Sequence, residues 1–294
     1  NGSSGLAGQA RSQLNRMFDG RFAQREKMHK LVKEHPQYTY TDEKGYLHIS
    51  DEDASVALIK SIDLYSQRIA IYKIVDLIKT TQKSDIIEIE KIKEMCKKAS
   101  RSRNDFLVDE LVNSYHFSVY YDSAYSMAVL GMIVPTIESL FYEIFINIGE
   151  LLDSKFVQLD NERFSSIKKS TIWDCHYSLN KGKTSKNIVE GIKQLAQITN
   201  FEKFLPPDYL EIVDALITYR NSMFHNGLEW QKKEIDKFDQ KLKSSKWEKD
   251  WFYCSKRDSK PWIYYMTDKM IDRSLKLINE IEIAAGSYYI ENMD

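Results

Sequence analysis

Apolar residues recur every three or four positions along most of this 294-residue chain, which is the spacing of helices that bury one face. The chain holds only 5 prolines and 11 glycines, so few residues interrupt these patterns. The stripes predict helices at about residues 51–75, 85–98, 106–121, 123–156, 188–199, 209–225, 232–243 and 268–281, after a weaker amphipathic segment at 14–33. We therefore expect a mainly α protein.

Two short segments alternate polar and apolar residues instead, as β-strands do. In residues 37–49, tyrosines alternate with threonines before a polar turn. In residues 251–265, two aromatic runs enclose a polar tip that carries Lys256, Arg257 and Lys260. The sequence therefore predicts one or two short β-hairpins. We expect the aromatic residues of the second hairpin to pack over the helical core or at a dimer contact, and stacking on single-stranded RNA is the alternative.

Two polar segments indicate how the chain is divided. Residues 1–13 are mostly small and polar and lack the apolar core of a signal peptide, so we interpret them as a tail or an expression remnant. Serines, arginines and an asparagine interrupt the helical patterns at residues 99–104. We place a boundary there, between an N-terminal helical region with a short hairpin at 14–104 and a larger helical domain at 105–294.

Composition narrows the chemistry. The formal net charge is −1, so nucleic acid would have to bind a local basic patch and not the surface as a whole. Cys96, Cys175 and Cys254 lie far apart without the spacing of a metal site, so we expect reduced thiols in a cytoplasmic protein, and no bound metal. We see no run of about 18 apolar residues, and therefore expect no membrane span.

Two ionisable residues interrupt otherwise apolar stripes. Arg220 lies on the stripe of the 209–225 helix, and Glu138 is centred on the long stripe of the 123–156 helix. A buried charge that loses its partner costs about 3–5 kcal/mol. Since the two charges are opposite, we predict that Glu138 faces Arg220. The pair either fixes the register of two helices or aims the guanidinium at a phosphate, and the sequence leaves both interpretations open.

The helix that carries Arg220 has recognisable ends. Asp208, with Glu211 three residues later, is typical of an N-cap with a capping box. Asn226 and Gly227 supply the left-handed conformation that ends a helix. The helix should therefore run from about residue 209 to 225.

Two further polar residues lie beside Arg220 near the end of this helix. Asn221 and His225 are four residues apart and share a face, so we expect the amide to hydrogen-bond the imidazole. His225 also lies where the helix dipole favours an imidazolium. The sequence thus predicts that Arg220, Asn221 and His225 converge at one helix end.

The order Arg220-Asn221, three residues, His225 resembles the RX4-6H signature of the HEPN superfamily, whose His closes the motif at a helix end. The resemblance spans roughly residues 126–294 and is best at 220–230. It implies a HEPN-like antiparallel helical bundle with a helical N-terminal extension. Some toxin members carry a tyrosine two residues after the His, where this chain has Gly227.

Many members of that superfamily are metal-independent endoribonucleases that act as dimers. The resemblance therefore implies RNA cleavage by attack of the 2′-hydroxyl, without metal or cofactor. His225 would be the acid/base, Arg220 would stabilise the phosphate charge, Asn221 would orient either one, and Glu138 would aim Arg220. A second copy would supply a second histidine, so we expect a homodimer. Many relatives act in toxin–antitoxin pairs or antiviral defence, which implies an inhibitory partner protein.

Two alternatives remain open. A non-catalytic helical module would bind nucleotides, RNA or a protein in the same cleft, with Arg220 as the phosphate anchor. Alternatively, Arg220, Glu138 and Asn221 form a purely structural network.

Other basic and titratable residues lie outside the motif. Lys181, Lys183 and Lys186 surround Gly182, and Lys256 and Arg257 lie at the tip of the aromatic hairpin. Both sets are candidates for RNA binding, with solvated loops as the alternative. We interpret His176 as an ordinary hydrogen-bonded histidine.

Overall fold

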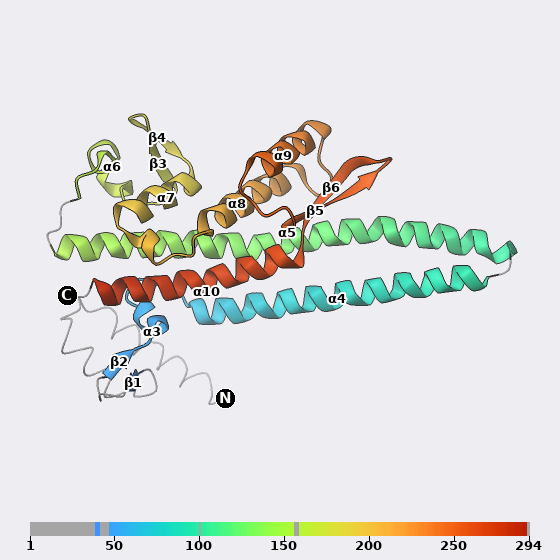
Figure 1. Cartoon of the computed structure of the whole chain (residues 1–294), viewed down its shortest axis with the longest axis horizontal. Coiled ribbons are helices and arrows are strands. Elements are labelled where there is room, and N and C mark those ends of the chain that lie inside the picture. The colour runs from blue at the N-terminus through green and yellow to red at the C-terminus, as the bar shows by residue number, and fades with distance from the viewer. Residues whose placement is uncertain (1–38, 42–46, 100, 156–158, 293–294) are drawn as a thin grey trace, which may run out of the picture.

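The computed structural model describes residues 39–41, 47–99, 101–155 and 159–292. Two long helices, α4 (Leu64–Lys98) and α5 (Arg101–Ser154), lie antiparallel, and α5 spans the length of the molecule (Figure 1). The last helix, α10 (Asp268–Glu291), lies beside them, and the segments from α6 to β6 lie on the opposite side of α5 (Figure 1). The expected mainly α fold is confirmed.

The other described elements are short. In chain order they are β1 (Thr39–Thr41), β2 (Leu47–Ile49), α3 (Asp51–Ser55), α6 (Glu162–Ser166), η2 (Lys169–Thr171), β3 (Tyr177–Asn180), β4 (Lys183–Lys186), α7 (Ile188–Ile198), η3 (Phe201–Lys203), α8 (Tyr209–Asn226), α9 (Lys232–Ser244), β5 (Phe252–Arg257) and β6 (Lys260–Met266). The strands pair as three antiparallel hairpins, β1–β2, β3–β4 and β5–β6, where we expected one or two. The turn of the first hairpin and the helix predicted at 14–33 lie outside the described residues.

The prediction of one helix over 51–75 is wrong, because the chain turns between α3 and α4. Leu58 is buried in this turn, and its carbonyl accepts a hydrogen bond from the Asn147 amide of α5 (3.0 Å). Helix α4 then begins after Asp63, whose carboxylate accepts from the Ser66 N–H (3.1 Å). The Asn147 side chain thus hydrogen-bonds the Leu58 carbonyl, which in a continuous helix would accept from a backbone N–H.

The new start of α4 changes which residues it buries. Tyr65, Ile69 and Tyr72, which we expected on the buried face, are exposed. Val75, also expected on that face, is buried, together with Leu64, Ile71 and Ile78. The same helix continues through the segment predicted separately at 85–98, where Ile89 and Ile92 are buried but Ile86 and Met95 are exposed.

Helix α5 is also a single helix, where we predicted two, and Pro135 lies inside it. By length and composition its segment Asp105–Ser154 is apolar enough to cross a membrane, but 56% of its most apolar window is buried inside this fold. The interruption predicted at residues 99–104 is the turn between α4 and α5. The division into two domains at that point stays a prediction.

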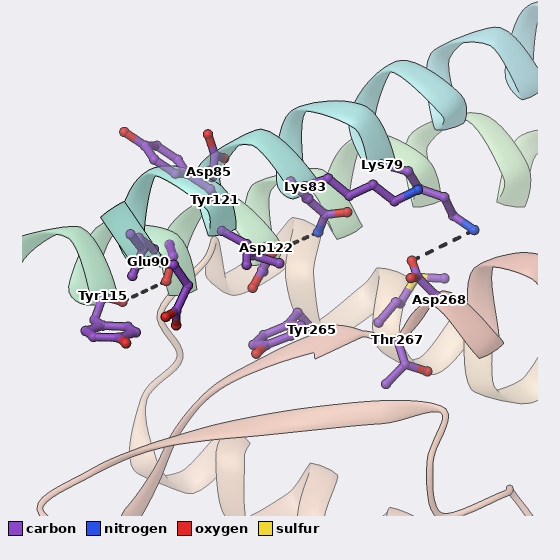
Figure 2. Close-up of a pocket in the computed structure, with 15 residues that line it drawn as sticks. Lys79, Lys83, Asp85, Glu90, Tyr115, Tyr121, Asp122, Tyr265, Thr267 and Asp268 are labelled. Atoms are coloured by element: carbon purple, nitrogen blue, oxygen red, sulfur yellow. Dashed lines mark hydrogen bonds and ion pairs between the residues drawn. The ribbon is translucent and has the colours of Figure 1, made fainter. Parts of the chain in front are cut away.

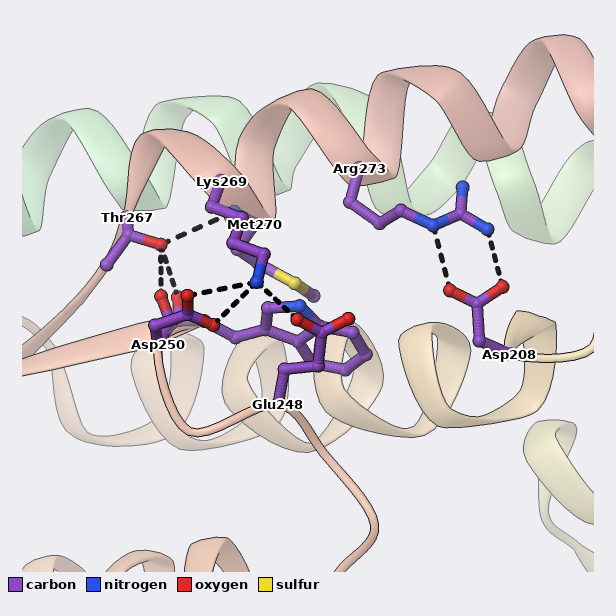
Figure 3. A network of polar contacts seen from close by, with 8 residues as sticks. Asp208, Glu248, Asp250, Thr267, Lys269, Met270 and Arg273 are labelled. Carbon is purple, nitrogen blue, oxygen red and sulfur yellow. Dashed lines mark hydrogen bonds and ion pairs between the residues drawn. The ribbon is translucent and has the colours of Figure 1, made fainter.

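Helix α10 is held to its neighbours by a close approach and by ion pairs. A Cβ on Gly286 would lie 1.7 Å from the Asp51 carbonyl oxygen, so only glycine allows α3 to cross α10 there. Arg273 donates two hydrogen bonds to Asp208 at the start of α8 (2.8 and 2.6 Å; Figure 3). Asp208 therefore makes no capping hydrogen bond, contrary to our expectation, and its contact with Arg273 lowers the pKa of its carboxyl.

The aromatic residues of the C-terminal third form a cluster over α8. Tyr219 lies at its centre, with ring centroids 5.8 Å from Trp230, 5.7 Å from Phe238 and 4.9 Å from Phe252. These rings are buried, as is Tyr264, whose carbonyl accepts from the Tyr219 hydroxyl (2.8 Å). Phe252 and Tyr264 belong to the β5–β6 hairpin. For these two residues, the expectation that the hairpin packs its aromatic residues on the helical core is confirmed.

We predict that Gly286→Ala lowers the free energy of unfolding by about 1–3 kcal/mol, as overpacking does, because the methyl group must push α3 away. Gly131→Ala in α5 is the matched control, since a Cβ there would lie 3.8 Å from Phe224 in ordinary contact. Chemical denaturation of both variants measures the effect. Equal stability of the two proteins would contradict the close α3–α10 contact.

Candidate active site

An open cleft of about 800 Å³ lies between α8, α5 and the segment that leads into α7. Its polar lining residues are Glu138, Asp174, His176, Tyr177, Lys186, Asn187, Glu190, Asp214, Thr218, Arg220 and Asn221. Three of the four residues predicted to be catalytic, Glu138, Arg220 and Asn221, are therefore in this cleft.

The predicted contact between Arg220 and Glu138 is confirmed. One guanidinium nitrogen, Nη2, donates to Glu138 Oε1 from the neighbouring helix. Nε and Nη1 make no hydrogen bond to any residue within the described ranges, and the Arg220 side chain is 33% exposed. The carboxylate thus holds one edge of the guanidinium and leaves the other donors open to the cleft.

The buried face of α8 differs from the predicted stripe. It consists of Tyr209, Ile212, Val213, Ala215, Leu216, Tyr219 and Met223. Arg220 lies at the edge of that face, and Phe224, predicted to be inward, is 51% exposed. Tyr219, which is buried at the centre of the aromatic cluster, was not among the residues predicted to face inward.

His225 does not line the cleft. It is exposed on the last turn of α8, about 7.5 Å farther along the axis than Arg220 and about 140° around it, by ideal helix geometry. The expected hydrogen bond between Asn221 and His225 is absent among the described residues. Within one chain, Arg220 and Asn221 share the cleft, whereas His225 lies outside it.

Another histidine occupies the cleft. Nδ1 of His176 lies 2.7 Å from Asp174 Oδ1, and the same oxygen accepts from the His176 backbone N–H (2.9 Å). The His176 ring lies 5.9 Å from the Tyr142 ring, and Tyr142 is one helical turn from Glu138 on α5. Two positions of α5 that are one turn apart thus contact the cleft residues: Glu138 contacts Arg220, and Tyr142 contacts the imidazole of His176.

A buried arginine holds the loop that carries this histidine. Arg163 donates to the carbonyls of Ile172 (2.7 Å), Asp174 (3.0 Å) and Tyr177 (2.8 Å), and burial lowers its pKa to about 10. Gly191 of α7 lies against the same loop, where a Cβ would be 2.0 Å from the Cys175 carbonyl oxygen. The sequence does not predict the roles of Arg163 and Gly191, since no local pattern indicates that Arg163 is buried.

Asp174, Cys175 and His176 place a carboxylate oxygen, a thiol and an imidazole nitrogen within 4.8 Å of one another. A metal ion would need the Cys175 thiolate, but that thiol is buried and burial raises its pKa. The Asp174 oxygen is already taken by His176. The donor set therefore fits a hydrogen-bonded imidazole better than a metal site. All three cysteines of the chain are free thiols.

The lysines predicted to bind RNA lie on two hairpins. Lys181 and Lys183 lie at the exposed turn and in β4 of the β3–β4 hairpin, which we had interpreted as a loop, and Lys186 of the same strand reaches the cleft. Lys256 and Arg257 lie in β5, with the Arg257 guanidinium 5.8 Å from the Trp262 ring. The two hairpins lie on the same side of α5, separated by α8 and α9 (Figure 1).

A second cavity, of about 350 Å³, lies between α4, α5 and the start of α10, and Gln82 donates to Asp122 there (2.8 Å; Figure 2). Four carboxylates line it, from Asp85, Glu90, Asp122 and Asp268, and two lysines oppose them. The Arg220 cleft has the same balance, with four carboxylates beside Lys186 and Arg220. The number of charges alone therefore does not distinguish the two cavities.

Comparisons of the chain with protein-family models, with curated proteins and with solved structures gave no match.

We predict that Arg163→Met lowers the free energy of unfolding by about 3 kcal/mol, because it leaves buried carbonyls without donors. Hydrogen exchange should rise most at residues 172–177, the loop that Arg163 holds. Lys168→Met, at an exposed position nearby, is the control for loss of a positive charge. Unchanged exchange in this loop would show that Arg163 does not hold it.

Proposed function

We propose that this protein is a metal-independent endoribonuclease that cleaves RNA by attack of the 2′-hydroxyl on the adjacent phosphate. We further propose that residues 105–294 form a HEPN-like helical domain, on the resemblance of the Arg220–His225 motif. A role as a toxin or defence effector, with an inhibitory partner protein in the cytoplasm, belongs to the same proposal.

The strongest support is the hydrogen bonding of the Arg220 guanidinium, compared with that of two other arginines. Arg163 and Arg273 have all three guanidinium nitrogens hydrogen-bonded to the protein. Arg220 uses only Nη2, on Glu138, and faces an open cleft. A fixed guanidinium with free donors is suited to bind two phosphate oxygens and to stabilise charge that develops during cleavage.

The surroundings of Arg220 support a polyanion in this cleft. Lys186 lines the cleft, and no carboxylate of the described residues lies within 4 Å of its Nζ. Asp214, an acid of the cleft, is paired with Lys241 (2.8 Å) and with the Trp247 indole (3.1 Å). The other three carboxylates of the cleft also have partners: Glu138 contacts Arg220, Asp174 contacts His176 and Glu190 lies 4.0 Å from Lys193. A single RNA strand would therefore meet Lys186 and the open donors of Arg220 beside carboxylates that are already engaged.

A non-catalytic binding module is the second candidate. The observation that favours it is the position of His225 outside the cleft, since the motif histidine then cannot transfer a proton beside Arg220 within one chain. In that case the protein would bind RNA or a nucleotide through Arg220 without cleaving it.

We predict that Arg220→Ala reduces single-turnover cleavage of mixed-sequence single-stranded RNA by about 100- to 1,000-fold, as removal of a charge-stabilising donor does. Arg220→Lys should restore little, because an ammonium lacks the planar fork. Lys203→Ala, an exposed lysine of η3, is the control. A chelator should leave the wild-type rate unchanged, and the products should carry 2′,3′-cyclic phosphate ends. RNA binding without cleavage by the wild type would favour the binding module.

The proposed homodimer has a candidate surface. The outer parts of α4 and α5, which we call the arm (residues 86–117), project beyond α10 (Figure 1). Large apolar side chains are exposed on it: Ile86, Ile87, Met95, Phe106, Val108, Val112 and Phe117. Lys93 pairs with Glu90 (2.9 Å) and Lys97 with Glu94 (2.6 Å) within α4, so a second arm would cover mainly the apolar side chains. Two such arms would make a four-helix bundle.

We predict that Val112→Glu weakens self-association at least tenfold, which corresponds to about 1.4 kcal/mol, because it puts a charge into the buried seam. Gln240→Glu, at an exposed position of α9, adds the same charge away from the arm. Sedimentation velocity over a concentration series measures both. A monomeric wild type would contradict the dimer, and equal effects of the two variants would contradict the arm as its interface.

A further inference from the structure

We propose that His176, held by Asp174, is the general base of the Arg220 cleft. This inference rests on the proposed ribonuclease function and assigns its proton transfer to a residue outside the Arg220–His225 motif. It replaces our interpretation of His176 as an ordinary hydrogen-bonded histidine.

The hydrogen bond to Asp174 determines which ring nitrogen is available. Since Nδ1 lies 2.7 Å from the carboxylate, it carries the proton, and Nε2 remains as the acceptor. Both residues line the cleft, and the His176 side chain is 46% exposed, whereas that of Asp174 is 20% exposed, so the ring is the more accessible of the two. An imidazole oriented by a carboxylate in this way is a common general base.

The loop that carries the dyad is fixed from behind. The three carbonyls that Arg163 binds belong to residues 172, 174 and 177, on either side of His176. The His176 carbonyl accepts from the Asn187 N–H at the start of α7 (3.0 Å). A base must hold its position within a fraction of an ångström during proton transfer, and these contacts restrain the backbone on both sides of it.

The position of His176 relative to Arg220 fits the chemistry. Both line one cleft, and both are tied to the same face of α5, through Tyr142 and Glu138 respectively. In the proposed step, Nε2 takes the 2′-hydroxyl proton as the 2′-oxygen bonds to phosphorus. The bond from phosphorus to the 5′-oxygen breaks, and that oxygen takes a proton from water. The imidazolium then returns its proton to solvent, so protons and electrons balance.

The test uses the full chain and single-turnover cleavage of mixed-sequence single-stranded RNA with chelator present. We expect His176→Ala to reduce the rate by about 100- to 10,000-fold, as loss of a general base does, and more than His225→Ala does. Asp174→Asn should also reduce the rate, because an amide no longer holds the proton on Nδ1, and Asp174→Glu should restore part of it. Lys203→Ala controls for surface changes, and thermal unfolding confirms that each variant is folded.

A second measurement does not depend on cleavage. In the wild type, inorganic phosphate should shift the ring resonances of His176 in a saturable way, and this shift should be lost in Arg220→Ala. If the wild type cleaves RNA and His176→Ala cleaves equally well, the assignment of His176 is overturned while the ribonuclease proposal stands. If the wild type cleaves no RNA, both proposals fail.

Discussion

Two opposite charges join the helices that form the cleft. Glu138 lies on α5, which runs through the core, and Arg220 lies at the edge of the buried face of α8. Each partly buried charge is favoured by the other. Their contact holds α8 to α5 at one wall of the cleft. The pair is partly open to solvent, so its effect on stability is smaller than that of a fully buried pair.

The molecule accommodates guanidinium groups in three ways, and the differences bear on function. Arg163 is surrounded by carbonyls and fixes a loop. Arg273 joins Asp208 and Glu280 and fixes α8 to α10. Arg220 is held at one nitrogen and left open at the others. Arg68 also uses one nitrogen, Nη1, on Asn279 and Glu282, so unused donors alone do not identify a ligand site. What links Arg220 to a proposed ligand is that it lines an open cleft.

Periodicity in the sequence predicted most helices, because it depends on residues a few positions apart. The contact between Glu138 and Arg220, 82 positions apart, was predicted because each charge interrupts an apolar stripe. The bounds of α8 and α9 and the start of α10 follow closely from local signals such as Gly227 and Thr267, but α10 continues to Glu291, beyond the predicted end at 281. The break before α4 was not predictable, since it depends on Asn147, far along the chain, bonding the Leu58 carbonyl. The pairing of His176 with Asp174 in the cleft was not predictable for the same reason. His176 reaches the cleft because Arg163 and Gly191 shape its loop, and no local sequence pattern indicates those contacts.

The central claim is that the open side of Arg220 receives a phosphate. The most direct test follows the Nε–H resonance of each arginine while an uncleavable 2′-O-methyl RNA of mixed sequence is added to the full chain. The account predicts a saturable shift of the Arg220 resonance and none for Arg163, whose donors are all occupied. Saturable RNA binding that shifts other resonances and leaves Arg220 unchanged would contradict it.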